Sequence, residues 1–182
     1  MKPANLISSL LIGLFLVFST NAVHAEDAAQ LDSNARAALN TLYASTPAAK
    51  ALGEKAVAIL VFPSVTKAGL GVGGQFGEGV LLQGGKTIGY FNSAGASVGL
   101  QAGIQTYRYA MFFMSAQIFE EFKTARGFEI GVGPTVVIVD SGMAKNFTTA
   151  TVQADIYAFV FGQKGLMAGF GLQGTKITKI EK

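Results

Sequence analysis

Hydrophobic residues in the first part of the chain follow a helical spacing. Between residues 26 and 45 the apolar side chains recur every three or four positions, at Leu31, Ala35, Ala38, Leu39 and Leu42. This spacing places them on one face of an amphipathic helix. Thr46-Pro47 then ends that helix and begins a second one over about residues 47–55, because proline fits the first helical position. We therefore predict two N-terminal helices within residues 26–55.

From residue 56 onward the pattern changes to one typical of strands. An apolar run over residues 56–62 ends at Pro63, and Gly84-Gly85 separates two further strand-like runs in the way a tight hairpin requires. Those two runs cover residues 75–83 and 86–92, and later ones cover residues 97–113, 128–139, 151–161 and 166–179. The pattern predicts an α+β fold: a β-rich, twisted antiparallel or barrel-like sheet of about seven to nine strands, with N-terminal helices and one inserted helix.

The inserted helix is predicted between Ser115, a suitable N-terminal cap, and Gly127, a suitable C-terminal stop. Ile118, Phe119 and Phe122 form its apolar face. This stripe and the aromatic residues between positions 107 and 113 are most simply interpreted as hydrophobic core.

Glycine is unusually dense in residues 67–79, where six glycines occur in 13 residues, and similar segments return at residues 93–106 and 164–175. Such density indicates backbone packed closely against backbone or against a ligand. The GxGxxG matches at residues 69–74 and 169–174 do not open a helix, as a dinucleotide site requires. The Gly84-Gly85-Lys86-Thr87 sequence lacks the spacing of a phosphate-binding loop. Close packing is therefore the interpretation that remains.

The chain begins with the features of a secretory signal peptide. Lys2 precedes an apolar segment over residues 6–18, and Val23-His24-Ala25 forms a small-residue cleavage pattern. We expect residues 1–25 to be removed and residues 26–182 to form a single domain, with helices over 26–55 and a β-rich core over 56–182. We then expect the protein to be exported to the periplasm or secreted, and to associate with a membrane surface.

Composition narrows the classes of function. The formal net charge is +3 and falls by one when Lys2 leaves with the leader, which is too weakly basic for nucleic-acid binding. The single histidine, His24, also leaves, and the chain has no cysteine. A Ser-His-Asp or Cys-His nucleophile and the usual zinc ligands are therefore missing. We predict a non-enzymatic protein with no catalytic residues, metal or cofactor.

The order and spacing of six segments resemble the SYLF family, the lipid-binding, actin-regulator-like domain. The resemblance covers about residues 46–180 and depends on residues 50–62, 67–79, 93–103, 112–122, 128–139 and 154–175. It implies binding to membrane lipid, often an anionic phosphoinositide, without catalysis, and in some members binding to actin. Residues 26–45 carry three acids against Arg36 alone, unlike the basic N-terminal segment of eukaryotic members. We expect a peripheral membrane-lipid partner here and no actin partner.

Lipid binding requires cations beside an apolar surface. Lys50, Lys55, Lys67 and Lys164 lie at element boundaries next to apolar or glycine-rich segments, and these four are the candidate lipid-binding residues. Lys67 and Lys164 hold matching places before two of the glycine-rich segments. The alternative for each is an ordinary solvated lysine.

Two other functions stay open at this point. Export, glycine-rich strands and suitable length are also compatible with a small outer-membrane β-barrel. The predicted helix near Phe119, however, interrupts the regular succession of strands that such a barrel has. A structural or assembly protein of the envelope, without a lipid ligand, is equally compatible. The oligomeric state and the identity of the lipid do not follow from the sequence.

Overall fold

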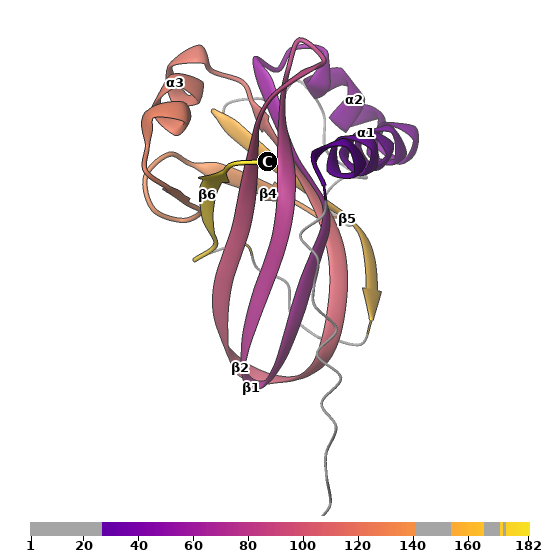
Figure 1. The fold of residues 1–182 in the computed structure, drawn as a ribbon, viewed down its shortest axis with the longest axis vertical. Helices are drawn as coiled ribbons and strands as arrows, with labels where there is room; N and C mark the ends of the chain where they lie inside the picture. Colours follow the sequence, from indigo (N-terminus) through magenta and orange to yellow (C-terminus); the bar gives the residue numbers. More distant parts are fainter. Residues whose placement is uncertain (1–26, 141–153, 166–171, 173) are drawn as a thin grey trace, which may run out of the picture.

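The computed structural model describes residues 27–140, 154–165, 172 and 174–182, so the predicted signal peptide lies outside the described residues. Within these ranges the chain forms three helices and six strands (Figure 1). The helices are α1 (Ala28–Ser45), α2 (Pro47–Gly53) and α3 (Ala116–Thr124). The strands are β1 (Ala58–Gln83), β2 (Lys86–Phe113), β3 (Phe128–Glu129), β4 (Val136–Val139), β5 (Ile156–Gly165) and β6 (Lys176–Ile180). The predicted α+β class is confirmed.

The N-terminal helices form where the sequence predicts them. Asp27 caps α1 by accepting a hydrogen bond from the Gln30 backbone N–H at 2.7 Å, and the five apolar residues of the predicted stripe are buried. Arg36 of α1 donates from Nη1 to the Gly85 carbonyl at 2.8 Å. The Thr87 hydroxyl donates to Asp32 at 3.0 Å. These contacts fix α1 to the turn between β1 and β2.

The strands β1 and β2 form one long antiparallel ribbon. Their pairing runs from Ala58 opposite Phe113 to Gln83 opposite Lys86. The turn is made by Gly84 and Gly85, with φ of 55° and 76°, as the hairpin prediction requires. The separate strands predicted over residues 56–62 and 75–83 are joined in a single strand, because the glycine-rich segment between them is itself paired with β2.

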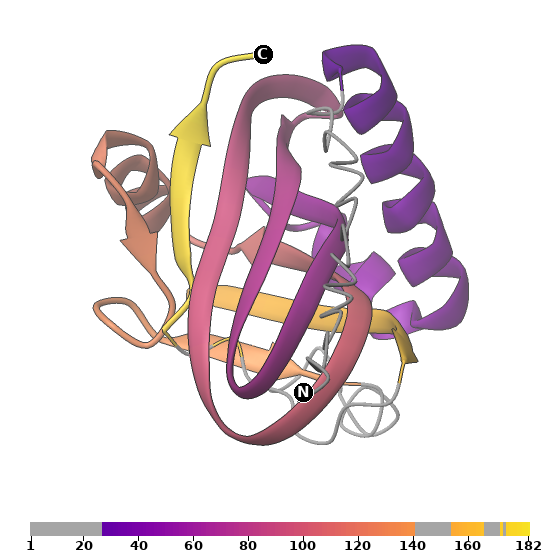
Figure 2. The same ribbon diagram turned by 60° about the horizontal axis from the view of Figure 1, so that its bottom comes forward.

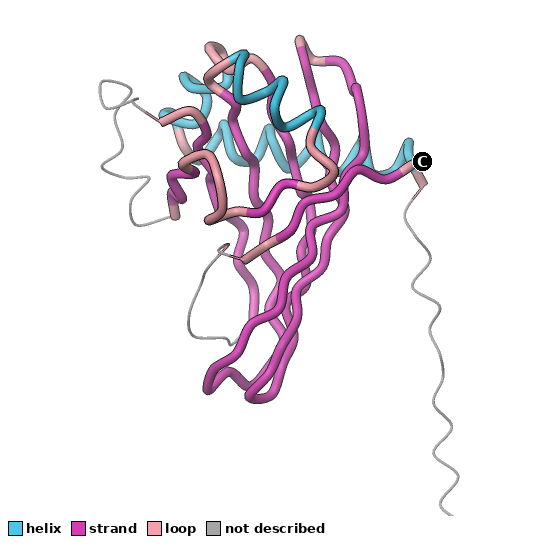
Figure 3. Tube along the Cα trace, turned by 90° about the vertical axis from the view of Figure 1, so that its left-hand side faces the viewer, coloured by secondary structure: helices cyan, strands magenta, loops and turns pink. Residues whose placement is uncertain are grey.

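The ribbon bends back on itself at the glycine-rich segment, and the bend projects beyond the helices (Figure 3). Gly71 at the bend has a φ of 75°. A Cβ added to Gly69 would lie 2.5 Å from the Gly73 Cα. The parts of each strand before and after the bend are here called its two arms. The two arms of β1 pack together: a Cβ on Gly77 would lie 2.5 Å from the Ser64 carbonyl oxygen. The prediction of backbone packed closely against backbone is confirmed here.

The remaining strands extend this bent ribbon at both of its sides. β5 pairs with the second arm of β2 and β6 with the first arm, both antiparallel, and β3 then pairs with β6. The sheet therefore runs β3-β6-β2-β5-β4, with β1 beside β2, and curls into a half-barrel (Figure 2). Because β1 and β2 each supply two arms, the number of arms fits the expected seven to nine strands.

Two details of the sheet differ from the sequence prediction. The predicted strand over residues 128–139 is divided into β3 and β4, because Gly131 and Gly133 have φ of 99° and 91° and interrupt the extended backbone. β4 also pairs with β5 in parallel, within an otherwise antiparallel sheet. The strands predicted over residues 151–161 and 166–179 correspond in part to β5 and β6, and their first residues lie outside the described ranges.

Two apolar clusters lie on opposite faces of the sheet. One fills the inside of the half-barrel and includes Phe119 and Phe122 of α3, which confirms their interpretation as core. The Phe122 ring centroid lies 4.8 Å from that of Phe113 and 5.1 Å from that of Phe91. The other cluster joins the buried faces of α1 and α2 to the outer side of the sheet.

Polar side chains also line the inside of the half-barrel. Gln75 donates from Nε2 to the Thr175 hydroxyl at 2.5 Å and accepts from the Tyr107 hydroxyl at 2.8 Å. The Tyr109 hydroxyl donates to Ser93 Oγ at 2.7 Å. Burial raises the pKa of both tyrosines well above the ordinary value, so both phenols are neutral donors at neutral pH. The glutamine of the first glycine-rich segment therefore joins β1 and β2 to the residues that precede β6.

Gly77→Ala is expected to destabilise the protein by about 1–3 kcal/mol, because its Cβ would collide with the backbone of the other β1 arm. Gly74→Ala is the matched control: its Cβ would meet only the Gly95 carbonyl oxygen at 3.7 Å, an ordinary contact. Urea unfolding followed by circular dichroism measures both. Equal midpoints for the two variants would contradict the close approach of the two arms.

Candidate functional site

The four candidate lysines occupy three different places. Lys50 lies on α2 and Lys55 just beyond it, both exposed at the helical end of the molecule. Lys164 is exposed near the end of β5. Lys67 lies inside the half-barrel, with only 4% of its surface exposed. The structure does not bring the four together.

Lys67 and Lys164 point to opposite faces of the same sheet although their places in the glycine-rich segments match. Lys67 is opposite Gln105 in the β1–β2 ladder, and both side chains are buried. Lys164 is opposite Thr106, the next residue of β2. Because neighbouring residues of a strand face opposite sides, a shift of one position separates an internal cation from an external one.

Lys67 and Gln105 form an unusual pair in the interior. In the described part of the chain, no carboxylate makes an ion pair with Lys67. Gln105 Oε1 is buried and has no hydrogen-bond partner among the same residues. An amide oxygen is costly to bury without a partner. Lys67 belongs to the interior, in contrast to the exposed Lys164.

Large apolar side chains gather at the projecting bend of the β1–β2 ribbon. Four of them are largely exposed and are here called the apolar tip: Leu70 (83% exposed), Val72 (68%), Ile104 (66%) and Phe76 (52%). The surrounding sequence has no charged residue between positions 68 and 77 or between positions 87 and 107. Several large exposed apolar side chains on one bent ribbon indicate an interaction site more often than freely solvated surface.

A polar groove of about 420 Å³ lies on the outer face of the sheet, beside α1. The chain there departs from regular pairing: the β1–β2 register shifts between Phe62 and Val65, and the β2–β5 register shifts between Thr106 and Arg108. Arg108 and Lys164 are the two cations of its lining, which contains no carboxylate. Bulges of this kind redirect side chains and are frequent beside functional sites.

Arg108 was not among the residues singled out from the sequence. It follows the tyrosine at position 107 inside a strand, where an arginine is ordinarily a solvated outer residue. The bulge that directs it into the groove depends on Gly162, whose φ is 62°. The sequence does not distinguish this glycine from the many others of the chain, because a positive φ leaves no local sequence pattern.

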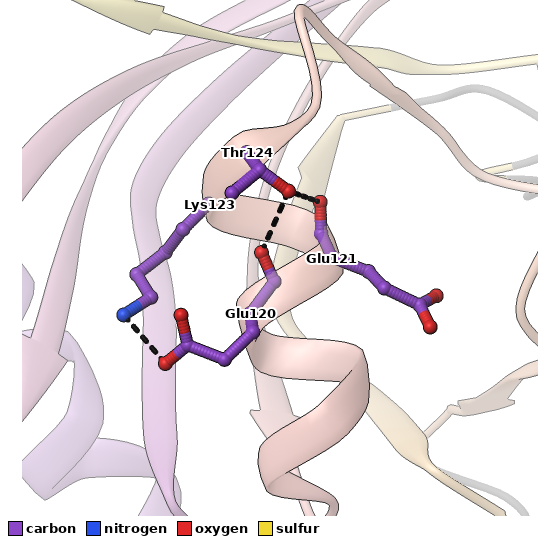
Figure 4. Close-up of polar contacts among 4 residues, drawn as sticks. All are labelled: Glu120, Glu121, Lys123 and Thr124. Carbon is purple, nitrogen blue, oxygen red and sulfur yellow. Dashed lines mark hydrogen bonds and ion pairs between the residues drawn. The ribbon is translucent and has the colours of Figure 1, made fainter.

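The adjacent carboxylates Glu120 and Glu121 do not converge on one site. Glu120 makes an ion pair with Lys123 at 2.7 Å, whereas Glu121 projects to the other side of α3 (Figure 4). The Thr124 hydroxyl donates to the backbone carbonyls of both residues, at 3.0 and 3.2 Å (Figure 4). This agrees with the expectation that neighbours on a helix do not face each other.

None of the helices in the described ranges is long and apolar enough to cross a bilayer. The apolar tip and the groove beside α1 are two candidate binding surfaces in the described part of the chain. The tip is uncharged and projects from the sheet, and the groove is cationic and lies beside α1.

One family model matches the chain. It is the Ysc84 model, described as Las17-binding protein actin regulator, and it matches residues 94–182. The match spans most of β2 and all later elements of the sheet. Among curated proteins, none matches the chain.

Lys67→Met is expected to leave the free energy of unfolding unchanged or to raise it by about 1 kcal/mol. The substitution keeps a long side chain in the interior and removes an ammonium group that has no carboxylate partner in the described ranges. Lys164→Met, at an exposed position, is the control and should change stability by less than about 0.5 kcal/mol. Thermal unfolding measures both. A clearly lowered midpoint for Lys67→Met would show that the ammonium group stabilises the fold.

Proposed function

We propose that the chain binds membrane lipid peripherally through its apolar tip, because residues 94–182 match the model of the Ysc84 (SYLF) family, a family of lipid-binding, actin-regulator-like domains. The observation that carries this proposal is the exposure of Leu70, Val72, Phe76 and Ile104 at the projecting end of the sheet.

The energy available at the tip is sufficient for reversible binding. Transfer of a fully exposed Leu or Ile side chain into an apolar environment contributes about 1.5–3 kcal/mol. Leu70 and Ile104 together can therefore supply several kcal/mol, which is the range of a weak and reversible membrane contact. The antiparallel pairing of β1 with β2 continues through the bend, with Leu70 opposite Ala102. This pairing satisfies backbone groups that would otherwise oppose entry into a lipid layer.

One exposed cation lies at a suitable height above the tip. Lys164 is opposite Thr106, which is two residues beyond Ile104 along β2. Two residues of a strand span about 7 Å, and interfacial segments bury their apolar side by about 5–10 Å. With the tip at the boundary of the acyl chains, Lys164 lies at the level of the lipid headgroups. This favours anionic lipid, whereas Lys50 and Lys55 lie at the helical end of the molecule.

The predicted leader supports a location outside the cytoplasm, in the periplasm or beyond. An exported chain does not meet cytoskeletal actin. We therefore assign it the lipid-binding activity of the family and not the actin-binding activity. The scarcity of ordinary catalytic residue types after position 25 supports a binding role without catalysis.

Export is tested by the N-terminus of the protein as the cell produces it. We expect intact-mass measurement of the osmotically released or secreted protein to give a chain that begins at Glu26. Ala25→Arg, which removes the small residue at the cleavage position, should retain residues 1–25. Recovery of the uncleaved wild-type chain from the cytoplasm would contradict the proposed location.

The Leu70→Asn/Ile104→Asn double variant tests the role of the tip. Its affinity for vesicles of mixed phosphatidylcholine and phosphatidylglycerol should fall at least tenfold, since 1.4 kcal/mol corresponds to a factor of ten. Co-sedimentation at several lipid concentrations measures this loss.

The matched control is Ile88→Asn/Val132→Asn, which removes two exposed apolar side chains away from the bend. Both double variants should stay folded with similar unfolding temperatures, because Leu70, Ile104 and Val132 are mostly exposed and Ile88 is 42% exposed. If the tip variant sediments with vesicles as the wild type does, the proposed membrane contact is wrong.

A further inference from the structure

We propose that the groove beside α1 binds a phosphate monoester, with Arg108 and Lys164 as its cationic ligands. The groove is distinct from the apolar tip. The proposal rests on the proposed function only where the phosphate is carried by a lipid headgroup. A small soluble phosphate ester presents the same chemistry, and the experiments below distinguish the two sources.

The groove has the size and lining of a ligand site. Its volume of about 420 Å³ lies within the usual range for small-molecule pockets. Arg108 and Lys164 come from two neighbouring strands, β2 and β5. Two hydroxyl groups, those of Ser64 and Thr106, belong to the same lining and can donate hydrogen bonds to an oxyanion, whereas the Thr41 hydroxyl already donates to the Ala37 carbonyl at 2.9 Å. The donors therefore come from three separate strands, β1, β2 and β5.

Neither cation of the groove is neutralised by the described part of the protein. Within residues 27–140, 154–165, 172 and 174–182, neither Arg108 nor Lys164 makes an ion pair. The segments outside these ranges contain a single acidic residue after the predicted cleavage point, Glu26. A pocket with two cations and no lining carboxylate favours a ligand that carries negative charge.

The backbone around Arg108 is shaped to hold its side chain. Gly162 lies at the irregularity between β2 and β5 and has a φ of 62°. A Cβ at this position would lie 3.3 Å from Arg108 Cδ and 3.6 Å from Nε. The glycine thus permits both the bulge and the close passage of the arginine side chain across β5. Arg108 is partly buried by this arrangement, in contrast to the freely exposed Arg126.

The chemistry of the two cations favours a monoester over other anions. An arginine guanidinium binds two phosphate oxygens at once, and a lysine adds a point charge. A phosphate monoester carries about −1.5 to −2 charges near neutral pH, which matches two cations. A phosphodiester carries a single charge and would leave one of them unmatched.

A second cavity of similar volume provides an internal comparison. It lies beside α3, also measures about 420 Å³, and contains Glu121 and Glu129 with one cation, Lys176. Its two carboxylates would repel an anion. Of these two cavities, only the groove beside α1 has a lining whose charged side chains are all cationic.

The first experiment measures binding of glycerol 3-phosphate and of inorganic phosphate to the protein by isothermal titration calorimetry. Arg108→Gln and Lys164→Gln should each weaken binding by roughly tenfold or more, since each removes a charge-assisted contact. Arg126→Gln is the matched control and should bind as the wild type does. Arg108→Lys keeps the charge and loses the two-oxygen contact, so it should bind between the wild type and Arg108→Gln.

The second experiment compares vesicles that contain phosphatidic acid, a monoester, with vesicles of equal surface charge that contain phosphatidylglycerol, a diester. A preference for phosphatidic acid that Arg108→Gln abolishes identifies a lipid source. Binding of glycerol 3-phosphate without such a preference identifies a soluble source. Both outcomes support the groove as a phosphate site.

The tip variant Leu70→Asn/Ile104→Asn separates this proposal from the proposed function. It should bind glycerol 3-phosphate as tightly as the wild type even where its vesicle affinity is lost. The groove proposal is overturned if neither phosphate compound binds and phosphatidic acid is not preferred. It is also overturned if a folded Arg108→Gln or Arg108→Lys variant binds these probes as the wild type does.

Discussion

The close approach of the two arms of β1 is the constraint on which the rest of this structure depends. At Gly77 and Gly79 the second arm lies against the backbone of the first with no room for a Cβ. This close approach lets one ribbon turn both of its arms toward the same interior. Because of the resulting bend, β6 pairs with the first arm of β2 and β5 with the second arm. The bend also places the apolar tip at the end farthest from the helices (Figure 3).

Much of this fold follows from local patterns. The spacing of Leu31, Ala35 and Ala38 predicts α1, the cap at Ser115 predicts α3, and Gly84-Gly85 predicts the hairpin. These features depend on residues near one another in sequence, where propensity and turn chemistry act directly. The continuity of β1 through residues 63–74 could not be predicted in this way. A glycine-rich segment signals a loop unless a distant partner strand supplies its hydrogen bonds.

The candidate site was less accessible to sequence reasoning than the fold. Matching positions in two glycine-rich segments suggested one role for Lys67 and Lys164, yet their strands present them to opposite faces. The face of a strand residue depends on register, and both bulges beside the groove shift that register. Arg108 was missed for the same reason. Exposure of Leu70 and Ile104 was likewise hidden, because an apolar residue in a strand is ordinarily expected to be buried.

The ladder between β1 and β2 also has an entropic consequence. The residues that pair beside the turn, Gln83 and Lys86, are close neighbours in sequence, whereas Ala58 and Phe113 at the other end are far apart. Each successive pair encloses only a few more residues than the pair before it. Since the entropy lost on loop closure grows slowly with loop length, the ribbon can extend from its turn without closing any long loop in a single step. The longest strands of the protein are thus assembled from a succession of short closures.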